Sequence, residues 1–346
     1  MKRLIPLFLL FSAATAFGQV LDAPVAVVRL TESVNIGRRE LSEQIGLFGQ
    51  QLGRDLTDDE KQQILDALIN DVLLLQGATR AGIQVSRAEI QNYLELQRQQ
   101  WSQLVGTMLT PEQFRAQIER ETGDSYESYV QDLTEELTKL KYVRQVKADL
   151  FASAPAPTEA EIEAVYEQEA TSFTNPAMVS FRHIYVDLRG KSDQERQEAR
   201  TLLDSLYRDI RNGVRTFDEV TRMAIDDPRF SAADFGYLLR NDSTNRQVLG
   251  TAFFDAVFAL QTGDIGGVYE SNVALHIVRI TDRRAPRILE LDDPLYPGES
   301  TTVRQQIEDA LIAERDQQTL LTAVDQLVDE LRDQATITLH ESNLPW

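Results

Sequence analysis

The middle of this 346-residue chain interrupts a helical pattern that runs on both sides of it. Residues 178–186 and 272–280 have the apolar, β-branched and aromatic composition of strands. Two helix-like stretches, residues 193–212 and 217–224, lie between them. A β–α–α–β block of this kind predicts a compact α+β domain. Any fold of the chain has to hold that domain within a helical surrounding.

The segment before this block predicts a series of helices. Thr57 and Glu60 have the spacing of a capping box, and apolar residues recur at helical intervals from Ile64 to Leu75. Ser86 and Glu89 repeat the box, and residues 126–150 predict a long helix. The whole region is therefore expected to be mainly α.

The two ends of the chain are expected to complete one another. Residues 24–30 predict a Val-rich strand, residues 301–334 a long amphipathic helix, and residues 335–339 a short final strand. A lone helix and strand cannot bury their apolar side chains, so we expect them to pack on the N-terminal helices and pair near residues 25–30. The predicted fold class is mainly α plus α+β, a split helical module with an inserted α+β domain.

These expectations give a division of the chain. The segments are a leader at 1–18, an N-terminal helical domain at 19–155, a linker helix at 156–176, the α+β domain at 177–284, and a C-terminal helix and strand at 285–346.

Charge and cysteine content limit the chemistry. Lys and Arg number 35 against 55 Asp and Glu, a formal charge of −20, which argues against nucleic acid as a partner. There are no cysteines, which excludes disulfides, thiolate metal sites and cysteine nucleophiles.

The first residues predict a secretory signal peptide. Lys2 and Arg3 precede a short apolar run, and Ala16 and Gly18 fit the small-x-small cleavage rule. The apolar run is too short to span a bilayer, and no other stretch is long enough. We therefore expect an exported chain in the periplasm, with no integral membrane segment after cleavage.

Two histidines stand out in the α+β block. His183 lies in its first strand and His276 in its last, where His276 shares a face with Val278 and Ile280. The first and last strands of a small antiparallel sheet can be neighbours, so the two imidazoles are able to meet. Taken alone, each histidine fits a hydrogen-bonded core residue better than a catalytic one.

Several blocks, in order and spacing, resemble the parvulin family of peptidyl-prolyl cis–trans isomerases. They are residues 181–186 (FRHIYV), 213–217, 226–228 (DDP), 233–238 (ADFGYL), 252–265 and 274–278 (ALHIV). The sequence departs from the family at two points. Val273 stands where a Ser or Thr often precedes the last-strand histidine, and the turn before Phe235 lacks the family's leading glycines.

The flanking segments extend this likeness. A strand, helices over 39–150, a parvulin insertion and a returning helix with a terminal strand resemble SurA-type periplasmic chaperones and the related foldases of Gram-positive bacteria. The resemblance implies binding of unfolded exported polypeptides, above all outer-membrane β-barrel precursors.

The resemblance also implies an active site. His183 and His276 would form the imidazole pair, and Asp227 would lie near the substrate carbonyl as a polar element. Leu249, Phe253 and Phe258 would form an apolar cup for the proline ring, although Phe258 fits a helix core better. The reaction needs neither cofactor nor metal, because it only rotates an amide bond.

Two alternatives stay open. The chain fits a non-catalytic holding chaperone whose parvulin domain only binds peptide. A metal hydrolase built on the two histidines and an aspartate would need a third ligand at a recognised spacing, which the sequence does not offer.

Overall fold

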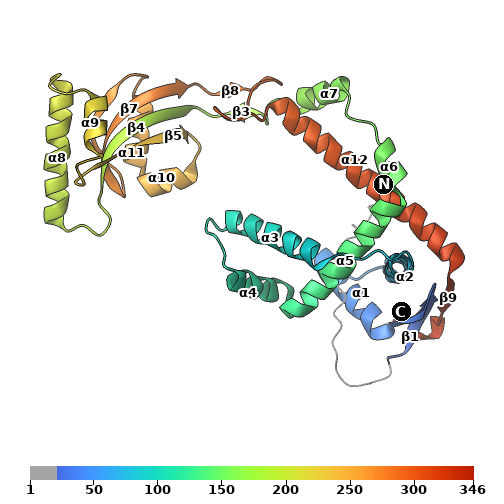
Figure 1. The fold of residues 1–346 in the computed structure, drawn as a ribbon. Helices are drawn as coiled ribbons and strands as arrows, with labels where there is room; N and C mark the ends of the chain where they lie inside the picture. The colour runs from blue at the N-terminus through green and yellow to red at the C-terminus, as the bar shows by residue number, and fades with distance from the viewer. Residues whose placement is uncertain (1–21) are drawn as a thin grey trace. The chain divides into compact units, whose positions relative to one another are not determined.

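The computed structural model describes residues 22–346, which form two compact units (Figure 1). One unit contains the described residues up to Ala156 together with Ala313–Trp346, and the other contains Pro157–Ile312. The predicted fold class, a split helical module with an inserted α+β domain, is confirmed. The predicted leader at 1–18 lies outside the described residues.

The first unit is mainly helical. Its elements are β1 (Pro24–Arg29), β2 (Ser33–Gly37), α1 (Arg38–Leu52), α2 (Asp58–Arg80), α3 (Arg87–Leu104), α4 (Pro111–Thr122), α5 (Tyr126–Val146), α6 (Ala148–Ser153), the later part of α12 (Val303–Gln334), β9 (Thr336–Leu339) and η1 (Glu341–Asn343). Six of these helices, α1 to α5 and α12, have the lengths of ordinary surface helices or more. Among residues 22–346 no helix combines the length and apolar character needed to cross a bilayer.

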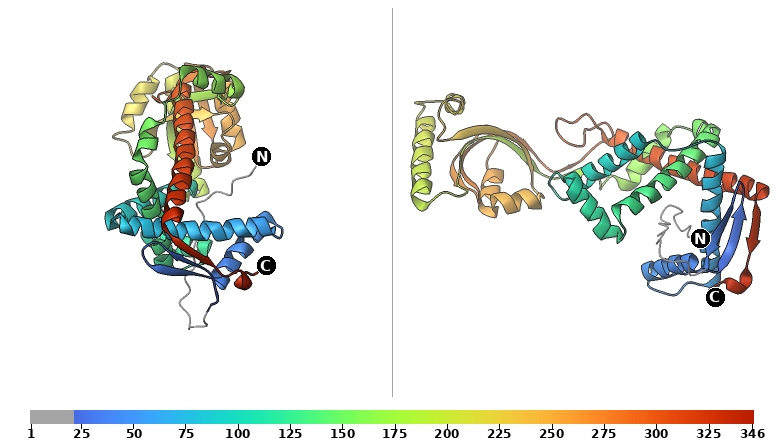
Figure 2. Two further views of the ribbon diagram at one scale, coloured as in Figure 1. Left: turned by 90° about the vertical axis from the view of Figure 1, so that its right-hand side faces the viewer. Right: turned by 60° about the horizontal axis from the view of Figure 1, so that its bottom comes forward.

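A three-stranded sheet joins the two ends of the described chain. Its strand order is β2-β1-β9, and both pairings are antiparallel. Ala26 pairs with Leu339 and Arg29 with Thr336, so the blue first strand and the red last strand run side by side in Figure 2. The predicted pairing of the terminal strand is confirmed.

The long helix α12 contributes to two separate apolar clusters. Val303, Ile307 and Leu311 pack with residues of α7 (Glu159–Glu169). Further along, residues from Leu320 to Leu331 pack in the main core of the first unit, with β1, α1, α2 and α5. One continuous apolar stripe therefore has two partners along its length.

The second unit is an α+β domain with its own core. Its elements are α7, β3 (Thr174–Asn175), β4 (Met178–Asp187), α8 (Asp193–Arg211), α9 (Phe217–Met223), β5 (Ser231–Leu239), α10 (Ser243–Leu249), α11 (Thr251–Ala259), β6 (Ile265–Glu270), β7 (Ala274–Arg284), β8 (Arg287–Ile288) and the start of α12.

Four antiparallel strands form its central sheet, in the order β5-β4-β7-β6. Alternate residues of β4 and β7 serve opposite faces. Ile184 and Ile277 face α8 and α9, whereas Phe181 and Val278 face α10 and α11. The yellow helix α8 and the orange helices α10 and α11 accordingly lie on opposite sides of the strands in Figure 2.

Candidate functional site: a hydrogen-bonded imidazole pair

The two histidines of the second unit meet on the α11 face of the sheet. Strand β4 pairs with β7 so that Tyr185 is opposite His276 and His183 is opposite Val278. His183 and His276 are therefore diagonal neighbours, a position from which long side chains reach each other. Their rings lie parallel within 9°, with centroids 5.2 Å apart.

A chain of hydrogen bonds fixes both rings. His183 Nδ1 lies 3.0 Å from His276 Nδ1, and His276 Nε2 lies 2.9 Å from Ser271 Oγ. Ser271 Oγ also accepts the backbone N–H groups of Val273 and Ala274, at 3.2 and 3.0 Å.

Ser271 bears on the order of protons in this chain. A hydroxyl oxygen has two lone pairs, and both are used by the two backbone donors. Its single proton has two acceptors within reach, the Ala274 carbonyl at 3.1 Å and His276 Nε2 at 2.9 Å. When it points to His276, that ring carries its own proton on Nδ1 and donates it to His183 Nδ1. His183 then holds its proton on Nε2, an atom that forms no hydrogen bond within residues 22–346.

Sequence analysis missed Ser271. The family pattern draws attention to the residue three before the last-strand histidine, which here is Val273. The structure supplies a hydroxyl from five residues before His276, in the turn between β6 and β7. The signal was present, because Ser271 and Asn272 are turn-forming residues directly before the strand.

Burial keeps both imidazoles neutral near neutral pH. His183 and His276 are buried, and loss of hydration lowers the pKa of His183 to about 4 and that of His276 to about 3. The nearby His183 lowers the pKa of His276 further. The pair can therefore orient and donate hydrogen bonds, but it does not present a positive charge at pH 7.

Aromatic rings surround the pair. The Phe253 ring of α11 lies 4.4 Å from the His276 ring, and Tyr185 stacks on His183 at 4.5 Å. Phe235 of β5 meets His183 edge-on and stacks on Phe181 at 4.6 Å. Phe235 and Tyr185 are only partly buried, so they give the site its accessible aromatic surface.

The other residues predicted for the cup lie in the same core. Leu249, at the end of α10, is 5% exposed, and Phe253 is 1% exposed. Phe258 stacks on Phe254 at 5.0 Å and lies under the guanidinium of Arg240, 4.8 Å from its ring centre. The structure thus joins Phe253 to the histidines and places Phe258 on the helix-core side of α11.

Asp227 lies in the connection between α9 and β5. Its carboxylate accepts hydrogen bonds from the side chain and the backbone N–H of Arg229, which lower its pKa to about 2. No contact within residues 22–346 links it to either imidazole. The carboxylate that acts on His183 is Asp234, whose charge partly opposes the lowering of the histidine pKa.

A glycine holds the helical corner of the site against the turn that bears Ser271. Gly250 joins α10 to α11 with φ +85°, ψ 143°, a conformation that is essentially restricted to glycine. A Cβ there would lie 2.8 Å from Asn272 Oδ1, while Asn272 N–H bonds Leu249 C=O at 3.0 Å. Because Gly250 has no side chain, the start of α11 can approach the turn between β6 and β7.

Residues 22–346 contain no group of three His, Asp or Glu side chains arranged to hold a metal ion. The imidazole pair is joined to Ser271, and His183 Nε2 has no partner within residues 22–346. The arrangement is suited to binding a polar group beside aromatic surface.

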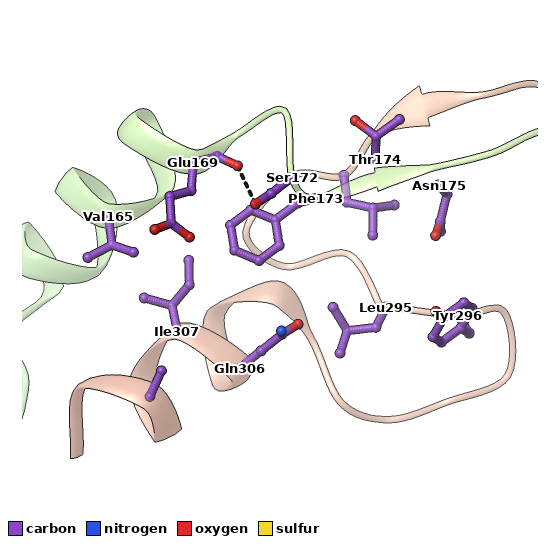
Figure 3. Close-up of a pocket in the computed structure, with 12 residues that line it drawn as sticks. Val165, Glu169, Ser172, Phe173, Thr174, Asn175, Leu295, Tyr296, Gln306 and Ile307 are labelled. Atoms are coloured by element: carbon purple, nitrogen blue, oxygen red, sulfur yellow. Dashed lines mark hydrogen bonds between the residues drawn. The ribbon is translucent and has the colours of Figure 1, made fainter. Parts of the chain in front are cut away.

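A larger cavity lies elsewhere in the second unit. It measures about 500 Å³ and is bounded by α7, β3, the loop after β8 and the start of α12 (Figure 3). Phe173, Leu295 and Ile307 give it apolar walls, and Ser172 Oγ donates a hydrogen bond to the Glu169 carbonyl at its rim. None of its lining residues belongs to the four-stranded sheet.

Comparison with known proteins agrees with this architecture. A model of the SurA-like N-terminal domain matches residues 7–143, and a model of the PPIC-type peptidyl-prolyl isomerase domain matches residues 157–293. The chain thus resembles SurA-like proteins in its N-terminal part and PPIC-type isomerases in the part that follows.

Individual relatives are distant. The chain is 25% identical to Chaperone SurA of Pectobacterium atrosepticum over 82% of this chain and 63% of the relative. It is 27% identical to Chaperone SurA of Methylobacillus flagellatus over 81% of this chain and 62% of the relative. The chain thus spans less than two thirds of the length of these curated relatives.

Among solved structures, the chain matches a SurA-like chaperone of Campylobacter jejuni with a TM-score of 0.36 and 15% identity over 92% of this chain and all of the other. PrsA of Bacillus subtilis gives a TM-score of 0.27 and 15% identity over 88% of this chain and 91% of the other.

Proposed function

We propose that this protein is an exported folding factor that binds unfolded polypeptides and accelerates rotation about Xaa-Pro bonds in its single parvulin-type domain. The observation that carries the catalytic part is the chain from Ser271 through His276 to His183, which leaves Nε2 of His183 without a partner within residues 22–346. Periplasmic location and outer-membrane β-barrel precursors as clients belong to the same proposal.

The chemistry asks little of the protein. Amide resonance gives a rotation barrier of about 18–20 kcal/mol, and a site lowers it by binding the twisted amide better than either planar form. Twisting removes the amide resonance, so the carbonyl oxygen becomes a weaker acceptor and the lone pair returns to the prolyl nitrogen, which becomes a better one. An Nε2–H of His183 would be a neutral donor suited to that nitrogen, held in place by the other two members of the chain.

The remaining residues would position the substrate. Leu249 and Phe253 would form the apolar floor under the proline ring, with Phe258 behind them in the same core. Asp227 would act on the flanking chain from the α9–β5 connection, where Arg229 now holds its carboxylate.

The test is exchange spectroscopy by NMR on an unphosphorylated Xaa-Pro peptide, which needs no coupling enzyme. We expect wild-type protein to accelerate exchange and His276→Ala and His183→Ala to lose most of the acceleration. Asp227→Ala is compared with Asp226→Ala, its exposed neighbour, which should retain activity. Absence of acceleration by the folded wild type would refute the catalytic part.

One observation favours a second candidate, a holding chaperone without catalysis. Leu249 and Phe253 are almost wholly buried, so the predicted cup offers a proline ring little open surface. A holding chaperone would suppress aggregation of an unfolded outer-membrane protein equally well with His276→Ala and with wild type, while neither accelerates exchange.

A further inference from the structure

A small cavity in the first unit combines apolar walls with an excess of acid. It measures about 90 Å³ and lies between α1, α2 and α5. Its lining consists of Leu68, Val72 and Leu75, the acids Glu40, Asp71, Asp132, Glu135 and Glu136, and Lys139. This volume exceeds what one water needs and suits one small head group.

The single cation of the cavity neutralises only part of the charge. Lys139 Nζ lies 2.9 Å from Asp71 Oδ1 and 2.5 Å from Glu136 Oε1. Glu40, Asp132 and Glu135 form no ion pair with any of residues 22–346. Three carboxylates therefore share the cavity without a counter-charge.

Asp132 gives a second, independent sign of a missing partner. Its side chain is only 8% exposed, and its buried Oδ2 atom has no hydrogen-bond partner. Orphaned buried oxygens are rare and costly in folded proteins. Burial and the neighbouring acids raise the pKa of Asp132 to about 6, so it is largely ionised at neutral pH despite that cost.

We propose that this cavity binds the ammonium group of a lysine side chain from an unfolded client polypeptide. The inference rests on the proposed chaperone function and gives it a preference for basic residues. The four-carbon stem of lysine would lie along Leu68, Val72 and Leu75, and its head would donate to the carboxylate of Asp132. A compact ammonium suits so small a space better than the planar fork of arginine.

A metal ion is a weaker occupant. No group of three acids or histidines within residues 22–346 has the arrangement that holds a metal. An ammonium needs no such coordination geometry, because its three donors rotate freely.

The experiment compares two peptides on the full-length protein. Each is an unstructured, aromatic-rich twelve-residue probe without proline, with lysine or norleucine at one central position. Norleucine keeps the aliphatic stem and lacks the ammonium. We expect the lysine probe to bind about tenfold more tightly at low salt, the value of one charge-assisted hydrogen bond, and the ratio to fall as salt is raised.

Variants locate the effect. Asp132→Asn and Glu135→Gln should bring the ratio close to one, while Asp149→Asn, an exposed acid of the same unit, should leave it unchanged. Circular dichroism confirms that each variant is folded.

The outcomes separate the inference from the function beneath it. Equal binding of both probes by wild type would overturn the lysine site and leave the chaperone proposal standing. A lysine preference that persists in Asp132→Asn would also overturn it. If neither probe binds and the protein does not suppress aggregation, both the lysine site and the chaperone proposal are refuted.

Discussion

The two units each bury a cluster of ionisable groups, and they treat them in opposite ways. In the second unit His183 and His276 are buried, neutral and joined to Ser271, and no fully buried side-chain nitrogen or oxygen of that unit lacks a hydrogen bond. In the first unit Asp132 is buried with an orphaned oxygen beside four other carboxylates and one lysine.

The difference shows where each unit can gain by binding. A satisfied network rigidifies its site and specifies one geometry. An unsatisfied one stores free energy that a complementary ligand would release. The first favours a precise donor for a reaction, and the second favours capture of a cation.

The largest expected effect comes from removing the only cation of the acidic cavity. Lys139→Met leaves Asp71 and Glu136 facing each other without a counter-charge, so we expect a loss of about 3 kcal/mol in unfolding free energy at pH 8. The loss should shrink at pH 5, because the carboxyls then take up protons. Urea unfolding followed by tryptophan fluorescence reports this unit, since Trp101 and Trp346 both lie in it.

Lys141→Met is the matched control. Lys141 lies on α5, like Lys139, and forms a surface ion pair with Glu89 of α3. Exposed pairs of this kind contribute about 0–1 kcal/mol. Equal losses for the two variants would show that the buried position of Lys139 has no special weight.

The histidine pair predicts a pH dependence of the second unit. The folded pKa values, about 4 and about 3, lie below the unfolded value of about 6.5. The unfolded state therefore binds more protons over this range, and stability falls as pH drops from about 6.5 toward 4. Hydrogen exchange by mass spectrometry should show β4 and β7 losing protection in that window. Constant protection of both strands from pH 7 to 4 would contradict it.

Asp132 predicts the reverse slope in the first unit. Its folded pKa of about 6 exceeds the unfolded value of about 3.9, so the folded state holds the extra proton and stability falls as pH rises from 4 to 6. Asp132→Asn should therefore stabilise this unit by about 1–3 kcal/mol at pH 8 and by little at pH 4. Tryptophan fluorescence measures both, with Asp149→Asn as the control.

The sequence predicted the architecture well, because its signals are local. Capping boxes at Thr57 and Ser86 do start helices, and the alternation in β4 and β7 did place both histidines on one face. The sequence did not predict that the apolar residues of α12 divide between two clusters, because a single apolar stripe does not indicate how many partners it packs against.

The details of the site were harder to predict, because they depend on contacts between distant segments. Ser271 could not be assigned without the turn geometry that aims it at His276. The acidic cavity assembles from α1, α2 and α5, and each of its carboxylates looks like an ordinary surface charge in the sequence. Spatial clustering, not residue type, distinguishes Asp132 from the many other acids of this chain.

The smallest expected effect tests the proton order of the imidazole pair. Ser271→Ala removes the donor to His276 Nε2 and should cost about 1–2 kcal/mol of unfolding free energy. If Ser271 had only a structural role, its removal would lower the stability and leave the ring tautomers unchanged. In the proposed chain the loss also frees His276 to move its proton to Nε2, which reverses the bond to His183 and takes the proton from His183 Nε2. The ¹⁵N NMR shifts should therefore show that the protonated nitrogen of each ring has changed. Ser205→Ala, on the exposed face of α8, should leave both tautomers unchanged. Unchanged tautomers in Ser271→Ala would show that the ring order is set elsewhere. The acidic cavity has no comparable chain of hydrogen bonds in which protons are ordered, and in this respect the two clusters differ.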